Sequence, residues 1–83
     1  MIILGDIGNT ETKIWLVNNN DKIIKKIVIP SKGKKLSLLN KYFKKLDFSS
    51  IDKILFCSVV PSTYKELKRY FYNKTKVRCH ELK

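Results

Sequence analysis

The stretch M-I-I-L-G-D-I-G-N-T, residues 1–10, decides the fold. Residues 1–6 are mostly apolar, which is typical of a strand with apolar side chains on both faces, and hence of a central strand in a sheet. Residues 6–10 then put a carboxylate at the end of that strand, followed at once by a glycine, an amide and a hydroxyl. A carboxylate can hold a divalent cation, and a glycine lets backbone N–H groups approach an anion. The stretch therefore predicts a metal–phosphate site on a central strand.

Five residues form this predicted site. Asp6 is the candidate metal ligand, and Gly8 lets the backbone of the turn approach phosphate. Asn9, Thr10 and Lys13 supply hydrogen-bond donors for phosphate oxygens. The alternative is that Asp6 merely caps a turn, that Gly8 permits its backbone angles, and that Lys13 is a solvated strand residue. The agreement of Asn9, Thr10 and Lys13 favours the phosphate site.

Outward from this stretch, the chain alternates between strand and helix periodicity. Strands are predicted at residues 11–17, 22–29, 51–60 and 76–82, and amphipathic helices at residues 36–46 and from Thr63 to Phe71. An Asn-rich turn at residues 18–21 joins two antiparallel strands, Pro30 ends the third strand, and residues 31–35 form a polar loop.

Side-chain spacing gives the details of the two helices. In the first, the apolar stripe is Leu36, Leu39, Phe43 and Leu46. Thr63 and Glu66 match a capping box at the start of the second, whose stripe continues through Tyr64, Leu67 and Phe71. Trp15, Phe43, Tyr64 and Phe71 are expected in the core.

The resulting order, β-β-β-α-β-α-β, predicts an α/β fold with one mixed sheet and helices on its faces. With an Asp at the end of the first strand, the order resembles the ribonuclease H-like plan, which includes the actin-like ATPases. The chain ends at a predicted strand with no helix after it, so that strand would have one poorly covered face. An incomplete domain is therefore expected.

Composition limits the class of protein. The 83 residues are enough for one domain, and 43% of them are hydrophobic, as in ordinary globular proteins. We expect neither a signal peptide nor a membrane-spanning segment, and so a cytoplasmic protein. Cys57 and Cys79 lack metal-binding spacing and are predicted to be reduced core residues, while Cys79 and His80 make a poor metal pair.

The net charge of +11 suggests an anionic partner, but the kinds of basic residue that produce this charge argue against one. All 18 basic residues except Arg69 and Arg78 are lysines, and they are spread along the chain. Proteins that read bases or clamp phosphates favour Arg for its bidentate fork. A solvated lysine-rich surface is favoured, and neither nucleic acid nor a membrane is expected as a partner.

Two motifs resemble those of the type III pantothenate kinases. The family's amino-terminal motif, D-x-G-N-T or D-x-G-N-S, matches residues 6–10, and Lys13 stands where the family often has a lysine. Residues 58–62, S-V-V-P-S, look like the family's S-V-V-P segment between the fourth strand and the next helix. The two motifs stand at about the family's separation, and the resemblance extends over essentially the whole chain.

The resemblance implies ATP-dependent phosphorylation of pantothenate, the first step of coenzyme A synthesis. It implies Mg-ATP and a monovalent cation (potassium or ammonium) as cofactors, pantothenate as substrate and a homodimer in the full-length protein. By the same resemblance, Asp6 helps to hold the metal, Gly8, Asn9 and Thr10 line the phosphate turn, and Lys13 contacts phosphate.

The family's members are much longer, with two similar domains and the active site between them. Their G-x-D-R segment, with the proposed base for the substrate hydroxyl, has no counterpart in residues 1–83. We therefore expect this chain to be a single ribonuclease H-like domain, the amino-terminal portion of a two-domain kinase. It would carry the first phosphate loop, contain no catalytic residue and be inactive alone.

Two alternatives belong to other functional classes. A ribonuclease H-like nuclease or resolvase needs several carboxylates around two metal ions, but the fourth predicted strand ends in C-S-V-V, without an acid. A non-catalytic regulator resembling the Bvg accessory factors would share the kinase pattern without transferring phosphate.

Overall fold

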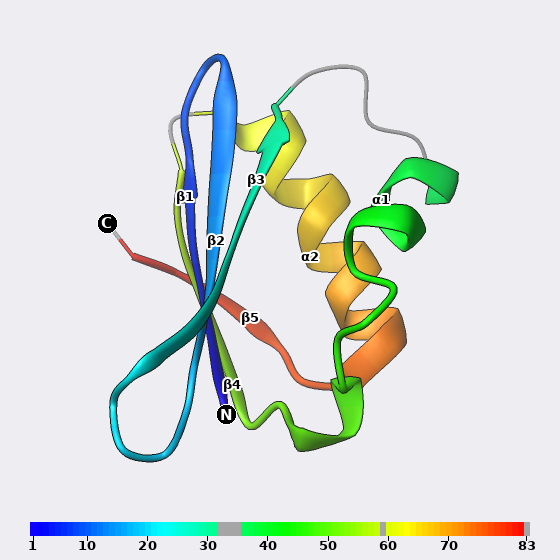
Figure 1. Cartoon of the computed structure of the whole chain (residues 1–83). Helices are drawn as coiled ribbons and strands as arrows, with labels where there is room; N and C mark the ends of the chain where they lie inside the picture. Colours follow the sequence, from blue (N-terminus) through cyan, green and yellow to red (C-terminus); the bar gives the residue numbers. More distant parts are fainter. Residues whose placement is uncertain (32–35, 59, 83) are drawn as a thin grey trace.

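The computed structural model in Figure 1 describes residues 1–31, 36–58 and 60–82. Its elements are β1 (Ile2–Ile7), β2 (Glu11–Val17), β3 (Ile23–Pro30), α1 (Leu36–Tyr42), the 3-10 turn η1 (Phe48–Ser50), β4 (Lys53–Ser58), α2 (Pro61–Thr75) and β5 (Cys79–Leu82). Apart from η1, this is the predicted order. The predicted polar loop at residues 31–35 lies, except for Ser31, outside the described residues.

The sheet is mixed, as predicted, with the strand order β3-β2-β1-β4-β5. β1 is its central strand, antiparallel to β2 and parallel to β4, while β2–β3 is antiparallel and β4–β5 parallel. The first three strands form two hairpins, whereas the parallel strands need crossovers, which α1 and α2 provide. The architecture is an α/β fold compatible with the ribonuclease H-like plan.

Both helices lie on the same side of the sheet (Figure 1). Because strand side chains alternate, Ile3, Gly5 and Ile7 of β1 are buried beneath the helices, while Asp6 is exposed on the other face. We call this other face the open face. Trp15 belongs to it, because its neighbours Ile14 and Leu16 point to the core; the prediction of Trp15 as a core residue was therefore wrong.

The core between sheet and helices is rich in aromatic rings. The Phe71 ring centroid lies 5.1 Å from that of Phe43 and 6.0 Å from that of Phe56, and all three side chains are buried. Burying each such ring contributes about 1.5–3 kcal/mol, so these contacts dominate the packing of α2 on the sheet. Phe43 and Phe71 were predicted as core residues; Tyr64 is only partly buried and packs at the edge of the core.

The first helix is shorter than predicted and ends at Tyr42 instead of Leu46. The chain then forms a tighter, 3-10-type turn, in which the Leu46 N–H donates to the Phe43 carbonyl three residues back. Asp47 next caps η1, accepting hydrogen bonds from the Ser49 N–H and hydroxyl. An aspartate that caps a new turn competes with the continuation of a helix.

The predicted capping box of α2 was also wrong. The N-cap residue is Val60, which makes no side-chain cap, and Pro61 starts the helix with its fixed φ. Thr63 is already inside the helix, where its hydroxyl donates to the Ser31 carbonyl at 2.8 Å. The Thr63 hydroxyl, which the local sequence pattern assigns to a helix cap, is thus used in a tertiary hydrogen bond.

Four strands differ in their bounds from those predicted, and β1 is Ile2–Ile7 instead of residues 1–6. β4 covers only Lys53–Ser58 of the predicted residues 51–60, and β3 includes Pro30, which an edge strand tolerates. β5 begins at Cys79, three residues late, because Lys76 adopts a left-handed conformation (φ 61°) and ends α2, its N–H donating to the Tyr72 carbonyl.

Gly5 lets the ring of Phe56 come close to the backbone of the central strand. A Cβ atom at this position would lie 2.0 Å from Cε1 and 2.1 Å from Cδ1 of Phe56, its partner on β4. The aromatic ring thus covers the central strand at the point where that strand has no side chain.

Gly5→Ala should lower the free energy of unfolding by about 3 kcal/mol or more, because neither the ring nor the paired backbone can move without loss of packing. Chemical denaturation measures the change. The double variant Gly5→Ala/Phe56→Leu should lose less than the sum of its single variants. Gly8→Ala, whose Cβ would meet only the Glu11 carbonyl oxygen at 3.2 Å, is the matched control. Equal costs for the two alanines would contradict the proposed contact.

Candidate phosphate site at the end of the central strand

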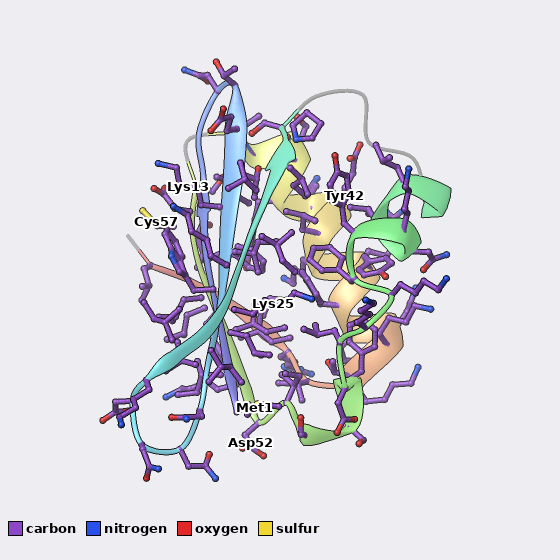
Figure 2. The ribbon with its side chains drawn as sticks, in the orientation of Figure 1. Met1, Lys13, Lys25, Tyr42, Asp52 and Cys57 are labelled. Carbon is purple, nitrogen blue, oxygen red and sulfur yellow. The ribbon has the colours of Figure 1, made fainter. Side chains whose placement is uncertain are left out.

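The sheet brings three polar side chains to one place on the open face. Asp6 on β1 is in register with Lys13 on β2 and with Cys57 on β4. Figure 2 shows Lys13 and Cys57 on the side of the sheet away from the helices. Because residues in register on adjacent strands point to the same face, the Asp6 carboxylate stands between an ammonium group and a thiol.

The turn that follows β1 is closed by its own backbone. The Gly8 N–H donates to the Glu11 carbonyl at 3.0 Å, and a Cβ at residue 8 would lie only 3.2 Å from that oxygen. Asn9 and Thr10 are exposed at the tip of this turn. Their side chains and the exposed Asp6 carboxylate therefore lie at the same end of the sheet.

Buried hydroxyl groups support the turn from below. The Ser31 hydroxyl donates to the Gly8 carbonyl at 2.6 Å, and its oxygen lies 2.9 Å from that of Thr12. The Ser31 N–H donates to the Thr10 carbonyl at 3.0 Å. Sequence reasoning missed Ser31 and Thr12. Thr12 could have been found from the alternation of β2, because it is a polar residue on the face where buried Ile14 and Leu16 follow at every second position.

The second sequence motif adjoins the turn. Ser58 is in register with Ile7, the last residue of β1, and its hydroxyl donates to the Val60 carbonyl and accepts from the Val60 N–H, both at 3.1 Å. These bonds shape the join into α2, which starts at Pro61. Val59 of this motif lies outside the described residues.

The charge pattern suits one cation held with phosphates. Across residues 1–31, 36–58 and 60–82, no group of three or more His, Cys, Asp or Glu side chains gathers to hold a metal ion. Mg²⁺ in phosphotransferases is typically held by one or two carboxylates together with substrate phosphates and water, and Asp6 fits that role. A two-metal nuclease site would need several converging carboxylates, which the described residues do not bring together.

Comparison with known proteins identifies the family of this chain. The family model of type III pantothenate kinase matches residues 2–83. The chain belongs to this kinase family. A curated type III pantothenate kinase from Pelagibacter ubique (strain HTCC1062) is 51% identical over 85 residues, covering 100% of this chain and 34% of the relative. The chain thus spans about a third of the length of this kinase.

The described helices of this kinase-family chain are too short or too polar to cross a membrane.

A cavity of about 440 Å³ lies between α2 and β5, lined by Lys68, Tyr72, Arg78, Cys79 and His80. None of the predicted site residues lines it, so it is separate from the phosphate turn.

Both cysteines of this chain are free, but only one of them is buried. Cys79 faces the helices, and burial raises the pKa of its thiol to about 11 although nearby Lys68 acts to lower it. Cys57 is exposed, because it follows buried Phe56 and therefore points to the open face. The prediction of two core cysteines was thus confirmed for Cys79 and wrong for Cys57.

At pH 8 a thiol reagent should modify Cys57 rapidly and Cys79 slowly. With a pKa of about 11, only about one Cys79 thiol in a thousand is ionised at that pH, and the thiolate is the reactive form. Mass spectrometry of the alkylated protein measures both rates. Cys57→Ser should abolish the fast phase and Cys79→Ser should keep it; a fast phase that survives in Cys57→Ser would overturn the assignment.

Proposed function

We propose that this chain forms the first nucleotide-phosphate-binding part of an enzyme that phosphorylates pantothenate with ATP, the first step of coenzyme A synthesis. Membership of the type III pantothenate kinase family supports the activity. The observation that carries the proposal is the register of Asp6, near the end of β1, with Lys13 of β2, on the two strands that the Gly8–Thr10 turn joins.

Each residue has a distinct role in this proposal. Asp6 holds Mg²⁺ together with the phosphates of ATP, and bound Mg²⁺ neutralises charge on those phosphates. Gly8, Asn9 and Thr10 line the phosphates, with Gly8 allowing the backbone to come close and the two polar side chains donating hydrogen bonds. Lys13 adds a positive charge beside them. Phosphoryl transfer depends mainly on such positioning and charge neutralisation.

The proposed active site is incomplete within this chain. The curated relative is about three times as long, and we assign the catalytic base, a second phosphate loop, the monovalent-cation site and the dimer interface to the part that this chain does not match. In this proposal residues 1–83 are the amino-terminal portion of a ribonuclease H-like domain. The chain alone then binds Mg-ATP weakly and does not turn over.

Alkylation of Cys57 gives a direct test, because its thiol neighbours Asp6 on the open face. Mg-ATP should slow this reaction in a saturable manner, since bound phosphates and metal would cover the thiol. Asp6→Asn removes the carboxylate charge and should raise the Mg-ATP concentration needed for half protection by about tenfold or more, as expected for loss of a charged contact. Alkylation rates across a Mg-ATP titration measure both effects.

Asp21→Asn is the matched control. Asp21 is exposed in the turn between β2 and β3, and its left-handed conformation (φ 60°) suits Asn. This variant should retain wild-type protection. If Mg-ATP protects Asp6→Asn and wild type equally, Asp6 does not hold the metal; if it fails to protect the wild-type chain at all, the site assignment is wrong.

A further inference from the structure

Three hydroxyl side chains are buried together beneath the phosphate turn. Thr12, Ser31 and Thr63 are 0%, 2% and 4% exposed, and the other buried side chains among the described residues are hydrophobic. They come from β2, from the residue directly after β3 and from the first turn of α2. A buried polar group is costly unless it is hydrogen-bonded, so the contacts among these three are significant.

Ser31 is the centre of this group. Its hydroxyl donates to the Gly8 carbonyl at 2.6 Å, so its single proton is committed to the turn. The oxygen–oxygen contact of 2.9 Å with Thr12 must then be a hydrogen bond that Thr12 donates. The chain of hydrogen bonds therefore runs in one direction: Thr12 donates to Ser31, and Ser31 donates to Gly8.

The backbone of Ser31 extends the connection in two directions. Its N–H donates to the Thr10 carbonyl at 3.0 Å, and its carbonyl accepts from the Thr63 hydroxyl at 2.8 Å. One residue therefore bonds to both ends of the Gly8–Thr10 turn and to the helix that follows the second motif. The Thr63 hydroxyl bonds to Ser31 and not to a residue of the turn, so the contact from α2 runs through Ser31.

We infer that Ser31 is a positioning residue that fixes the phosphate turn and couples it to the first turn of α2. A shift of Thr63 then changes the order of the turn, although Thr63 lies beneath the surface that would meet a ligand. The coupling rests on the hydrogen bonds alone, while its effect on nucleotide binding rests on the proposed function. A purely structural role would instead lower the stability of the whole chain without a particular effect at the turn.

Thr63→Val tests the coupling, because it keeps the side-chain shape and removes the donor to Ser31. The Gly8 and Ser31 amides, which donate within and into the turn, should exchange their hydrogens about threefold to tenfold faster than in wild type, as expected for one lost hydrogen bond. The exchange of Ile54 and Phe56 amides on β4 reports global opening and serves as the reference. Nuclear magnetic resonance resolves these amides individually.

Two further variants complete the design. Thr75→Val makes the same substitution in the same helix, far along α2 from the turn, and removes a hydroxyl that donates to the Phe71 carbonyl at 2.7 Å and accepts from the Val77 N–H at 3.0 Å. It should leave the ratio of turn exchange to β4 exchange unchanged. Thr63→Ser keeps the donor and should restore the wild-type ratio; if Thr63→Val does not fold, Ser31→Ala is judged by the same ratio.

Equal acceleration of the turn and the β4 amides in Thr63→Val would overturn the inference, since only global stability would have changed. A second readout links the coupling to ligand: the Mg-ATP concentration that half-protects Cys57 should rise severalfold in Thr63→Val. Absence of protection in wild type would count against the proposed function alone, because the exchange ratio decides the coupling without nucleotide.

Discussion

The parallel pairing of β1 with β4 is the constraint on which the rest of the structure depends. A hairpin cannot join two parallel strands, so the chain must cross over between them, and α1 lies in that crossover. The pairing also sets Gly5 opposite Phe56, where the missing side chain of one residue makes room for the ring of the other. The same register brings Asp6 beside Cys57 and Ile7 beside Ser58. The two sequence motifs therefore meet as a consequence of the strand pairing that also packs Phe56 over Gly5.

Coverage of the sheet on one side separates two kinds of chemistry. Among the described residues, the buried side chains on the helix side are hydrophobic except for three hydroxyls, whereas the open face carries the charged residues of the candidate site. Alternation along β1 is enough for this division, since Ile7 is buried and its neighbour Asp6 is exposed. The turn joins the two sides: its tip is exposed, and its carbonyls are bound from within the core by Ser31.

Local pattern predicted the order of the strands, and tertiary contact explains most of the failures. The order of elements, the central place of β1 and the bounds of β2 follow from periodicity and from turn residues. The capping box failed because the Thr63 hydroxyl bonds to Ser31, 32 residues away in sequence, which no local motif encodes. Cys57 was misplaced because a short apolar run does not reveal that only one face of its strand is covered.

The position of Trp15, the single tryptophan of the chain, has an optical consequence. It is partly buried on the open face, in register with Leu4 and with Lys26, whose ammonium lies 6.0 Å from the ring centroid. On β2 it is two residues from Lys13, and therefore on the same face as the candidate phosphate site. Its indole emission thus comes from one known location, and any molecule that covers the open face changes the polarity around a natural fluorophore.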